Sequence, residues 1–169
     1  EARRQVFGDG QVGTDVDRRG DHVVAALAHV DVVVCAKGFP GNTIAPVSGT
    51  LNFSPCSPSQ PISVIEFHGT EDQHVPYDGG YGPKSIVNVD FTSVQYSVGF
   101  WVSFDGCGSP PQTISFNDIR HEIWTGCADS TSVELYTIIG GGHSWPGGPG
   151  GLAGVDQSTS TISASELIW

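Results

Sequence analysis

The stretch "ISVIEFHG", residues 62–69, indicates the fold class most directly. It is a short run of apolar and β-branched residues that ends in a glycine, which is the pattern of a strand buried on both faces of a sheet. The same pattern recurs in "TIAPVSG" at residues 43–49 and in "SVELYTIIGGG" at residues 132–142. In the last run we expect either Ile138 or Ile139 to point inward, together with the alternate apolar residues before them.

Between and after these strands the apolar spacing predicts helices. "DFTSVQYSVGFWVSF", residues 90–104, carries apolar residues three and four apart behind Asp90, which we expect to be the N-cap. "STSTISASELIW", residues 158–169, begins with capping residues and predicts a second helix. Its apolar positions are Ile162, Leu167 and Ile168. "TISFNDIRHEIW", residues 113–124, predicts a hairpin or a loop excursion. Strands that alternate with helices are the pattern of a mostly parallel α/β sheet with flanking helices.

The chain changes character near residue 43, which divides it into two parts. Residues 43–169 follow the orderly pattern above, whereas residues 1–42 form an irregular segment without an assigned identity. "GDGQVGTDVDRRGDH", residues 8–22, has neither a strand period nor a helix period, and the apolar run at residues 22–36 fits either. That apolar run is interrupted by polar residues and is too short to cross a bilayer.

Composition narrows the class of partner. The chain has 169 residues, about the length of one domain, and its seven basic and 18 acidic residues give a net charge of −11. This charge repels the phosphates of nucleic acid and of anionic membrane surfaces. We therefore expect neither nucleic acid nor a membrane as a partner.

The four cysteines indicate disulfide chemistry rather than a metal site. No C-x-x-C pair is present in the sequence, which argues against a zinc site and thioredoxin-like chemistry. Cys107 and Cys127 lie in polar, turn-rich segments, and we favour a disulfide between them over free thiols. The bridge would close a loop of about 20 residues, contribute about 3 kcal/mol and imply an oxidising compartment. The pairing of Cys35 and Cys56 stays open.

Reactive side chains follow two of the predicted strands. His68, Asp72 and His74 come directly after one strand, and His143 follows the other behind three glycines. Functional groups gather beyond the carboxyl ends of parallel strands. If the two strands are neighbours, Asp72 lies beside His143 and fixes the tautomer of its ring. A carboxylate-oriented imidazole is what a general base facing a nucleophile requires.

Plainer interpretations of the same residues exist. A histidine in a glycine-rich loop is often an exposed loop residue, Asp72 suits a turn before Val75, and His68 suits a satisfied position at a strand end. A metal site is a further alternative, because one short loop supplies nitrogen and oxygen ligands. Those ligands are His68, Asp72, His74 and Asp78. The proline and two glycines of that loop favour a turn instead.

Longer motifs resemble a known family. "PISVIEFHGTEDQHVPYDGG" at residues 61–80, "WVSFDGC" at 101–107 and "WTGCADSTSVELYTIIGGGHSWPGG" at 124–148 are similar to the secreted polyhydroxybutyrate depolymerase, feruloyl esterase and acetyl xylan esterase group. The similarity covers about residues 43–169. It implies the C-terminal part of an α/β-hydrolase fold, incomplete on its N-terminal side, in a secreted carboxylic ester hydrolase. Implied substrates are polymer- or sugar-linked esters with hydroxyalkanoate, feruloyl or acetyl groups, and no cofactor is implied.

The resemblance also implies roles for individual residues. Asp72 falls on the triad acid and His143 on the triad base. Trp145 falls where the family lines its acyl or aromatic pocket, although a tryptophan packed under the loop is an equal alternative. Cys107 and Cys127 match a cysteine pair of the family, which supports the bridge proposed above.

The nucleophile is where the sequence departs from the family pattern. The family carries its serine on a G-x-S-x-G elbow, which is absent from this sequence, and no serine precedes Ser48. Ser48 follows the wrong strand and lacks the flanking pattern. We favour a frame-disrupted elbow region in residues 1–42 over a divergent member that lost catalysis or a remote substitute serine. The rival function is a non-catalytic binding module that keeps the cleft around Trp145.

Overall fold

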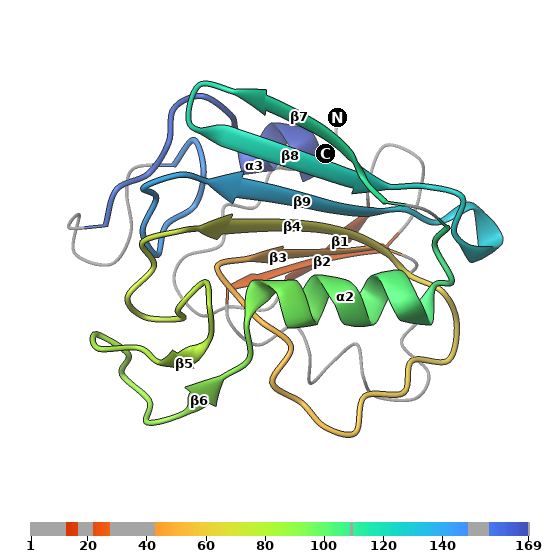
Figure 1. Ribbon diagram of the computed structural model, residues 1–169, viewed down its shortest axis with the longest axis horizontal. Helices are drawn as coiled ribbons and strands as arrows, with labels where there is room; N and C mark the ends of the chain where they lie inside the picture. The colour runs from red at the N-terminus through yellow and green to blue at the C-terminus, as the bar shows by residue number, and fades with distance from the viewer. Residues whose placement is uncertain (1–12, 17–21, 28–42, 109, 149–155, 169) are drawn as a thin grey trace.

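The computed structural model describes residues 13–16, 22–27, 43–108, 110–148 and 156–168 (Figure 1). Within these ranges the main element is a seven-stranded mixed sheet with the strand order β1-β2-β3-β4-β9-β8-β7. Its strands are β1 (Gly13–Val16), β2 (His22–Leu27), β3 (Thr43–Val47), β4 (Ser63–Gly69), β7 (Gln112–Phe116), β8 (Ile119–Trp124) and β9 (Val133–Ile138). A separate two-stranded sheet pairs β5 (Gly80–Tyr81) with β6 (Asp90–Phe91).

The centre of the sheet is parallel and its borders are antiparallel. Strands β2, β3, β4 and β9 run in the same direction, whereas β1 pairs antiparallel with β2 and the β7–β8 hairpin pairs antiparallel with β9. The three apolar runs of the sequence thus become three adjacent parallel strands. Residues 113–124 form the hairpin rather than a loop excursion.

One face of the sheet packs against helix α2 (Val94–Phe104). The shared core cluster consists of Ile44, Ile62, Val64, Val94, Val98, Trp101, Val133 and Leu135. The expectation that Asp90 caps this helix is wrong, because Asp90 pairs with Tyr81 in the small sheet. The N-cap is Ser93, whose hydroxyl accepts a hydrogen bond from the backbone N–H of Tyr96 at 3.1 Å.

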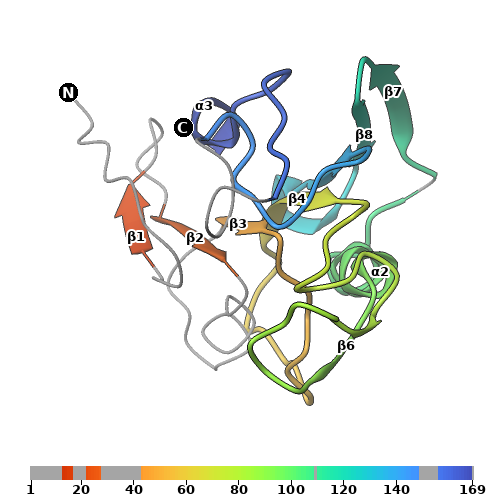
Figure 2. The ribbon, with the colours of Figure 1, turned by 90° about the vertical axis from the view of Figure 1, so that its left-hand side faces the viewer.

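The opposite face packs against the short helix α3 (Ala164–Ile168), so that the two helices lie on different sides of the sheet (Figures 1 and 2). This second cluster consists of Ala45, Val47, Phe67, Ile119, Tyr136, Ile138, Ala164 and Ile168. Ile138 therefore points inward, and Ile139 is 56% exposed. The second predicted helix is shorter than expected: Ile162 precedes it, and Leu167 is exposed.

The N-terminal segment contains two strands in its described part. The stretch without a detectable period includes β1 at Gly13–Val16. The backbone pairing with β2 defines this strand, although its sequence has no strand period. Strand β2 resolves the ambiguity of the first part of the apolar run and extends the parallel sheet beside β3. Residues 28–42, including Cys35, lie outside the described residues.

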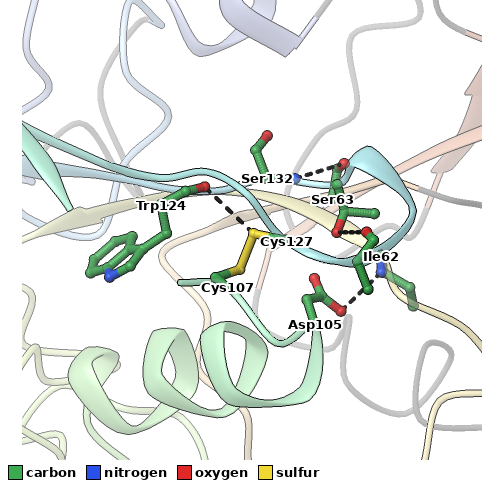
Figure 3. The surroundings of a disulfide bond; sticks show 9 residues. Ile62, Ser63, Asp105, Cys107, Trp124, Cys127 and Ser132 are labelled. Atoms are coloured by element: carbon green, nitrogen blue, oxygen red, sulfur yellow. Dashed lines mark hydrogen bonds between the residues drawn. A yellow bond between two sulfur atoms is a disulfide. The ribbon is translucent and has the colours of Figure 1, made fainter. Parts of the chain in front are cut away.

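A disulfide joins Cys107 to Cys127, as the sequence predicts (Figure 3). It links the chain just after α2 to the turn that follows β8. Next to it, the buried Asp105 ends α2 and accepts a hydrogen bond from the backbone N–H of Ile62 at 3.1 Å (Figure 3). The bridge and this carboxylate together fix the C-terminal end of the helix to the sheet. Among the described helices, none is long and apolar enough to cross a membrane.

Candidate active site

Two loops leave adjacent strands at the same edge of the sheet. Gly69, the last residue of β4, lies opposite Ile138, the last residue of β9, so the carboxyl ends of the two strands lie side by side at the left of Figure 1. The loops are then joined by backbone hydrogen bonds, including one from Glu71 N–H to the Gly141 carbonyl at 2.9 Å. A Cβ on Gly69 would lie 2.2 Å from that carbonyl oxygen, so only glycine allows this approach.

Asp72 is buried in the first loop, and its two carboxylate oxygens have different partners. Oδ1 accepts the backbone N–H groups of His74 and Val75 at 2.8 and 2.9 Å, which makes the turn that the sequence predicts. Oδ2 lies 2.8 Å from Nδ1 of His143 on the second loop. The turn and the carboxylate–imidazole contact are therefore compatible, because each uses one oxygen.

His143 is held with one ring nitrogen committed and the other open. A carboxylate can only accept, so Nδ1 is the donor in this bond, and a neutral imidazole in this tautomer has its lone pair on Nε2. Among the described residues no hydrogen bond reaches Nε2, and the side chain is 12% exposed. The preceding Gly140 has a φ of +74°, a left-handed conformation that favours glycine and turns the chain sharply into the loop. This arrangement can accept a proton at Nε2.

Next to Asp72 lie two further buried side chains, His68 and Glu66, of which the sequence pattern indicated only His68. His68 is fully buried, with Nε2 2.9 Å from the Val75 carbonyl oxygen and 3.5 Å from Asp72 Oδ2. Its Nδ1 lies 3.9 Å from Oε1 of the buried Glu66. Burial lowers the pKa of His68 and raises the pKa of Glu66 well above its ordinary value, since each loses solvation of its charged form. Both groups are therefore favoured in their neutral forms.

The metal-site alternative depends on side chains that the structure does not gather together. His68 points into the core, whereas the ring of His74 lies beside that of His143, with a centroid distance of 5.0 Å. Asp78 is exposed. In the described part of the chain, no group of three or more His, Cys, Asp or Glu side chains is placed to hold a metal ion.

Trp145 packs beneath the His143 loop. Its indole N–H donates to the Ser165 hydroxyl at 3.0 Å, and its ring packs against the core cluster shared with α3. The backbone carbonyl of Trp145 accepts from the Ser158 hydroxyl at 2.8 Å. These contacts anchor the loop to the helix, and a role for Trp145 in lining a substrate pocket stays a prediction.

The structure shows no nucleophile against His143 among the described residues. Ser48 lies at the carboxyl end of β3 with a φ of +55°, but it is 1% exposed. Its hydroxyl lies 3.5 Å from the Ser144 carbonyl oxygen, and its N–H donates to the Phe67 carbonyl. Strand β2, the neighbour of β3 on the side away from β4, ends at Leu27, and the residues that follow it lie outside the described ranges.

Comparison with known proteins supports a relationship to esterases. No family model matches the chain. The chain is 32% identical over 93 residues to feruloyl esterase B of Piromyces equi, an alignment that covers 53% of this chain and 17% of that protein. The chain thus spans less than one fifth of the length of this relative. At this identity and coverage, the similarity supports an esterase-type relationship but assigns no substrate.

Proposed function

We propose that this chain is part of a serine-type carboxylic ester hydrolase of the α/β-hydrolase fold, with Asp72 as the acid and His143 as the base. The observation that carries the proposal is the 2.8 Å contact between Asp72 Oδ2 and His143 Nδ1 across two neighbouring strand ends. It leaves Nε2 as the free proton acceptor, which is the arrangement that an acyl-transfer triad requires. The esterase similarity supports the same class of reaction.

In the proposed mechanism the serine hydroxyl attacks the ester carbonyl while His143 Nε2 takes its proton. The resulting imidazolium is stabilised by Asp72, whose buried carboxylate already faces Nδ1. His143 then gives the proton to the departing alkoxide, which leaves as the alcohol and produces an acyl-enzyme. Water, deprotonated by the same nitrogen, releases the carboxylic acid and returns the serine. No cofactor takes part in these steps.

We further propose that the serine belongs to a nucleophile elbow, a motif that is absent from residues 1–42 of this chain. In an intact protein the elbow would follow the strand beside β3, the position that β2 occupies here. Restoring the reading frame upstream of Thr43 tests this: the restored sequence is expected to contain G-x-S-x-G. A coding sequence without that motif in any frame would leave the proposal without its nucleophile.

The substrate we favour is a feruloyl ester, with acetyl and hydroxyalkanoate esters as the other members of the class. This choice is supported by the name of the matched relative alone. We also propose secretion, which the Cys107–Cys127 disulfide supports, because such bridges persist in oxidising compartments. The net charge of −11 disfavours nucleic acid as a partner.

The alternative function is a binding module that keeps the site but does not turn over substrate. The observation in its favour is that no hydroxyl group of the described residues reaches His143 Nε2. Hydrolysis of 4-nitrophenyl acetate separates the two. Without its serine, the chain is expected to hydrolyse this ester slowly, with water as the nucleophile, and His143→Ala is expected to lose that rate.

Two controls make the assay decisive. A rate that is equal in the chain and in His143→Ala, or absent from both, would favour the binding module. A rate that a chelator removes would favour the metal-dependent alternative. In a chain with the elbow restored, the rate is expected to rise by a factor on the order of 10³ or more, because a positioned nucleophile and its base act as a unit.

A further inference from the structure

A second carboxylate–imidazole pair lies directly beside the first. The ring of His74 is tilted by 40° against that of His143, with 5.0 Å between the ring centroids. Its Nε2 lies 3.3 Å from Oδ2 of Asp156, which belongs to the segment that precedes α3. Both side chains are nearly buried, at 15% and 8% exposure. Neither residue has a role in the mechanism above.

Asp156 also packs against the backbone of the loop that carries His143. A Cβ on Gly142 would lie 2.9 Å from the Asp156 Cβ and 3.1 Å from its Oδ1, so the absence of a side chain at Gly142 is what admits Asp156. The next residue continues the contact, because the Gln157 carbonyl accepts from Gly142 N–H at 3.0 Å and from the Ser144 hydroxyl at 2.9 Å. The segment at residues 156–158 thus contacts the loop at the residues directly before and directly after His143.

His74 in turn is fixed from its own loop. Its backbone N–H donates to Asp72 Oδ1 at 2.8 Å, and its carbonyl oxygen packs against Gly82, where a Cβ would lie only 2.1 Å away. The imidazole of His74 therefore extends from a fixed backbone toward Asp156, and its centroid lies 5.0 Å from that of the His143 ring. Asp72 thus contacts Nδ1 of His143, and the ring of His74 is a second neighbour of the same imidazole.

We propose that His74 and Asp156 are positioning residues that hold the ring of His143 in its bond to Asp72. Asp156 secures both loops with one side chain: its Cβ rests on Gly142, and its carboxylate orients His74. The ring of His74 then limits rotation of His143 away from Asp72. The inference rests on the proposed function for its catalytic meaning, but the geometry that it concerns can be measured separately. A base held within a fraction of an ångström transfers protons faster than one that swings.

The test follows the Nδ1 proton of His143 by NMR in the chain labelled with ¹⁵N-histidine. His74→Ala and Asp156→Ala are expected to speed exchange of this proton by about tenfold or more, because each frees the ring to leave Asp72. Asp156→Asn is expected to stay within about twofold of the unsubstituted chain, since the amide has the same shape, keeps the contact with Gly142 and places an oxygen or N–H group beside His74. The asparagine variant also guards against loss of folding in the alanine variants.

A matched control comes from a histidine outside the site. His121 is paired with Glu134 at 2.9 Å and is 16% exposed, so His121→Ala removes a similar pair from strand β8. It is expected to leave exchange at His143 unchanged. In ester hydrolysis, His74→Ala is expected to lower kcat by about tenfold with KM within about twofold, because the ring orders the base rather than the substrate.

The outcomes separate this inference from the function on which it rests. Unchanged exchange at His143 in both His74→Ala and Asp156→Ala would overturn the positioning role, even if His143→Ala abolished hydrolysis. Equal acceleration by Asp156→Asn and Asp156→Ala would also overturn it, because the conservative side chain would fail to rescue. A chain without any His143-dependent hydrolysis would refute the proposed function, and the exchange measurement would still decide the positioning role.

Discussion

The substitution Asp105→Asn tests how burial of a single carboxylate makes the stability of this fold depend on pH. Asp105 is fully buried at the end of α2, with Oδ1 bonded to the Ile62 N–H and Oδ2 without a hydrogen-bond partner among the described residues (Figure 3). Desolvation raises the pKa of Asp105 from 3.8 to about 6, and the bond from Ile62 opposes this only partly.

The sign of the effect follows from proton binding. Between the ordinary pKa and the raised one, the folded chain holds a proton on Asp105 that the unfolded chain has lost, so stability falls as pH rises through this window. A pKa that rises from 3.8 to about 6 corresponds to at most about 3 kcal/mol of stability lost between pH 3 and pH 7. Asparagine is neutral throughout, so the variant does not carry this loss.

The assay is urea unfolding of both proteins at several pH values from 4 to 8. The amide of the variant leaves a buried N–H group unbonded, which costs about 1–3 kcal/mol at every pH. The decisive quantity is therefore the change with pH in the stability difference between variant and unsubstituted chain, which is expected to approach 3 kcal/mol in favour of the variant on going from acid to neutral pH. Asp90→Asn, at an exposed position, serves as the control. A stability difference that does not vary with pH would refute the reasoning.

Four further changes test the fold. Glu66→Gln is expected to gain stability relative to the unsubstituted chain as pH rises, because burial raises the pKa of Glu66 and disfavours its charged form; parallel pH curves from thermal unfolding would contradict this. Replacing Cys107 and Cys127 together by serine is expected to cost about 3 kcal/mol in denaturant unfolding, as the 20-residue separation implies, and a loss near zero would count against the bridge as a major constraint. Gly69→Ala, which would clash with the facing loop, is expected to cost about 1–3 kcal/mol and to weaken the bond between the two loops. Gly99→Ala, with open space in the middle of α2, is expected to add about 0.5–1 kcal/mol instead; equal effects of the two alanines would show that the clash is absent.

Much of the sheet could be predicted from the sequence because its central strands are buried on both faces. Such strands appear as unbroken apolar runs, and the three runs quoted at the outset correspond to β3, β4 and β9. The position of β9 beside β4 could not be deduced from periodicity, because it depends on pairing between segments about 70 residues apart in the chain, where loop entropy and tertiary packing decide. Strand β1 could not be predicted for a similar reason: it is short, and only its pairing with β2 defines it as a strand.

At the site, the sequence could predict the pair of Asp72 and His143 but not the residues around it. His143 is conspicuous between glycines, and Asp72 follows a buried strand, so their approach could be expected if the strands were neighbours. Asp156 carries no local signal, since it follows a glycine-rich stretch and acts across 82 residues on His74. The buried Glu66 was likewise hidden, because a single acidic residue within an apolar run does not show which way it points.

The bond between Asp72 and His143 is expected to make the imidazole a working base. The most direct measurement compares 4-nitrophenyl acetate hydrolysis by the chain, by Asp72→Asn, and by Asp78→Asn, which alters an exposed carboxylate of the same loop. We expect Asp72→Asn to lower the His143-dependent rate by about tenfold or more, because the ring loses its tautomer and its counter-charge, and Asp78→Asn to leave it unchanged. Equal rates in all three proteins would contradict the account.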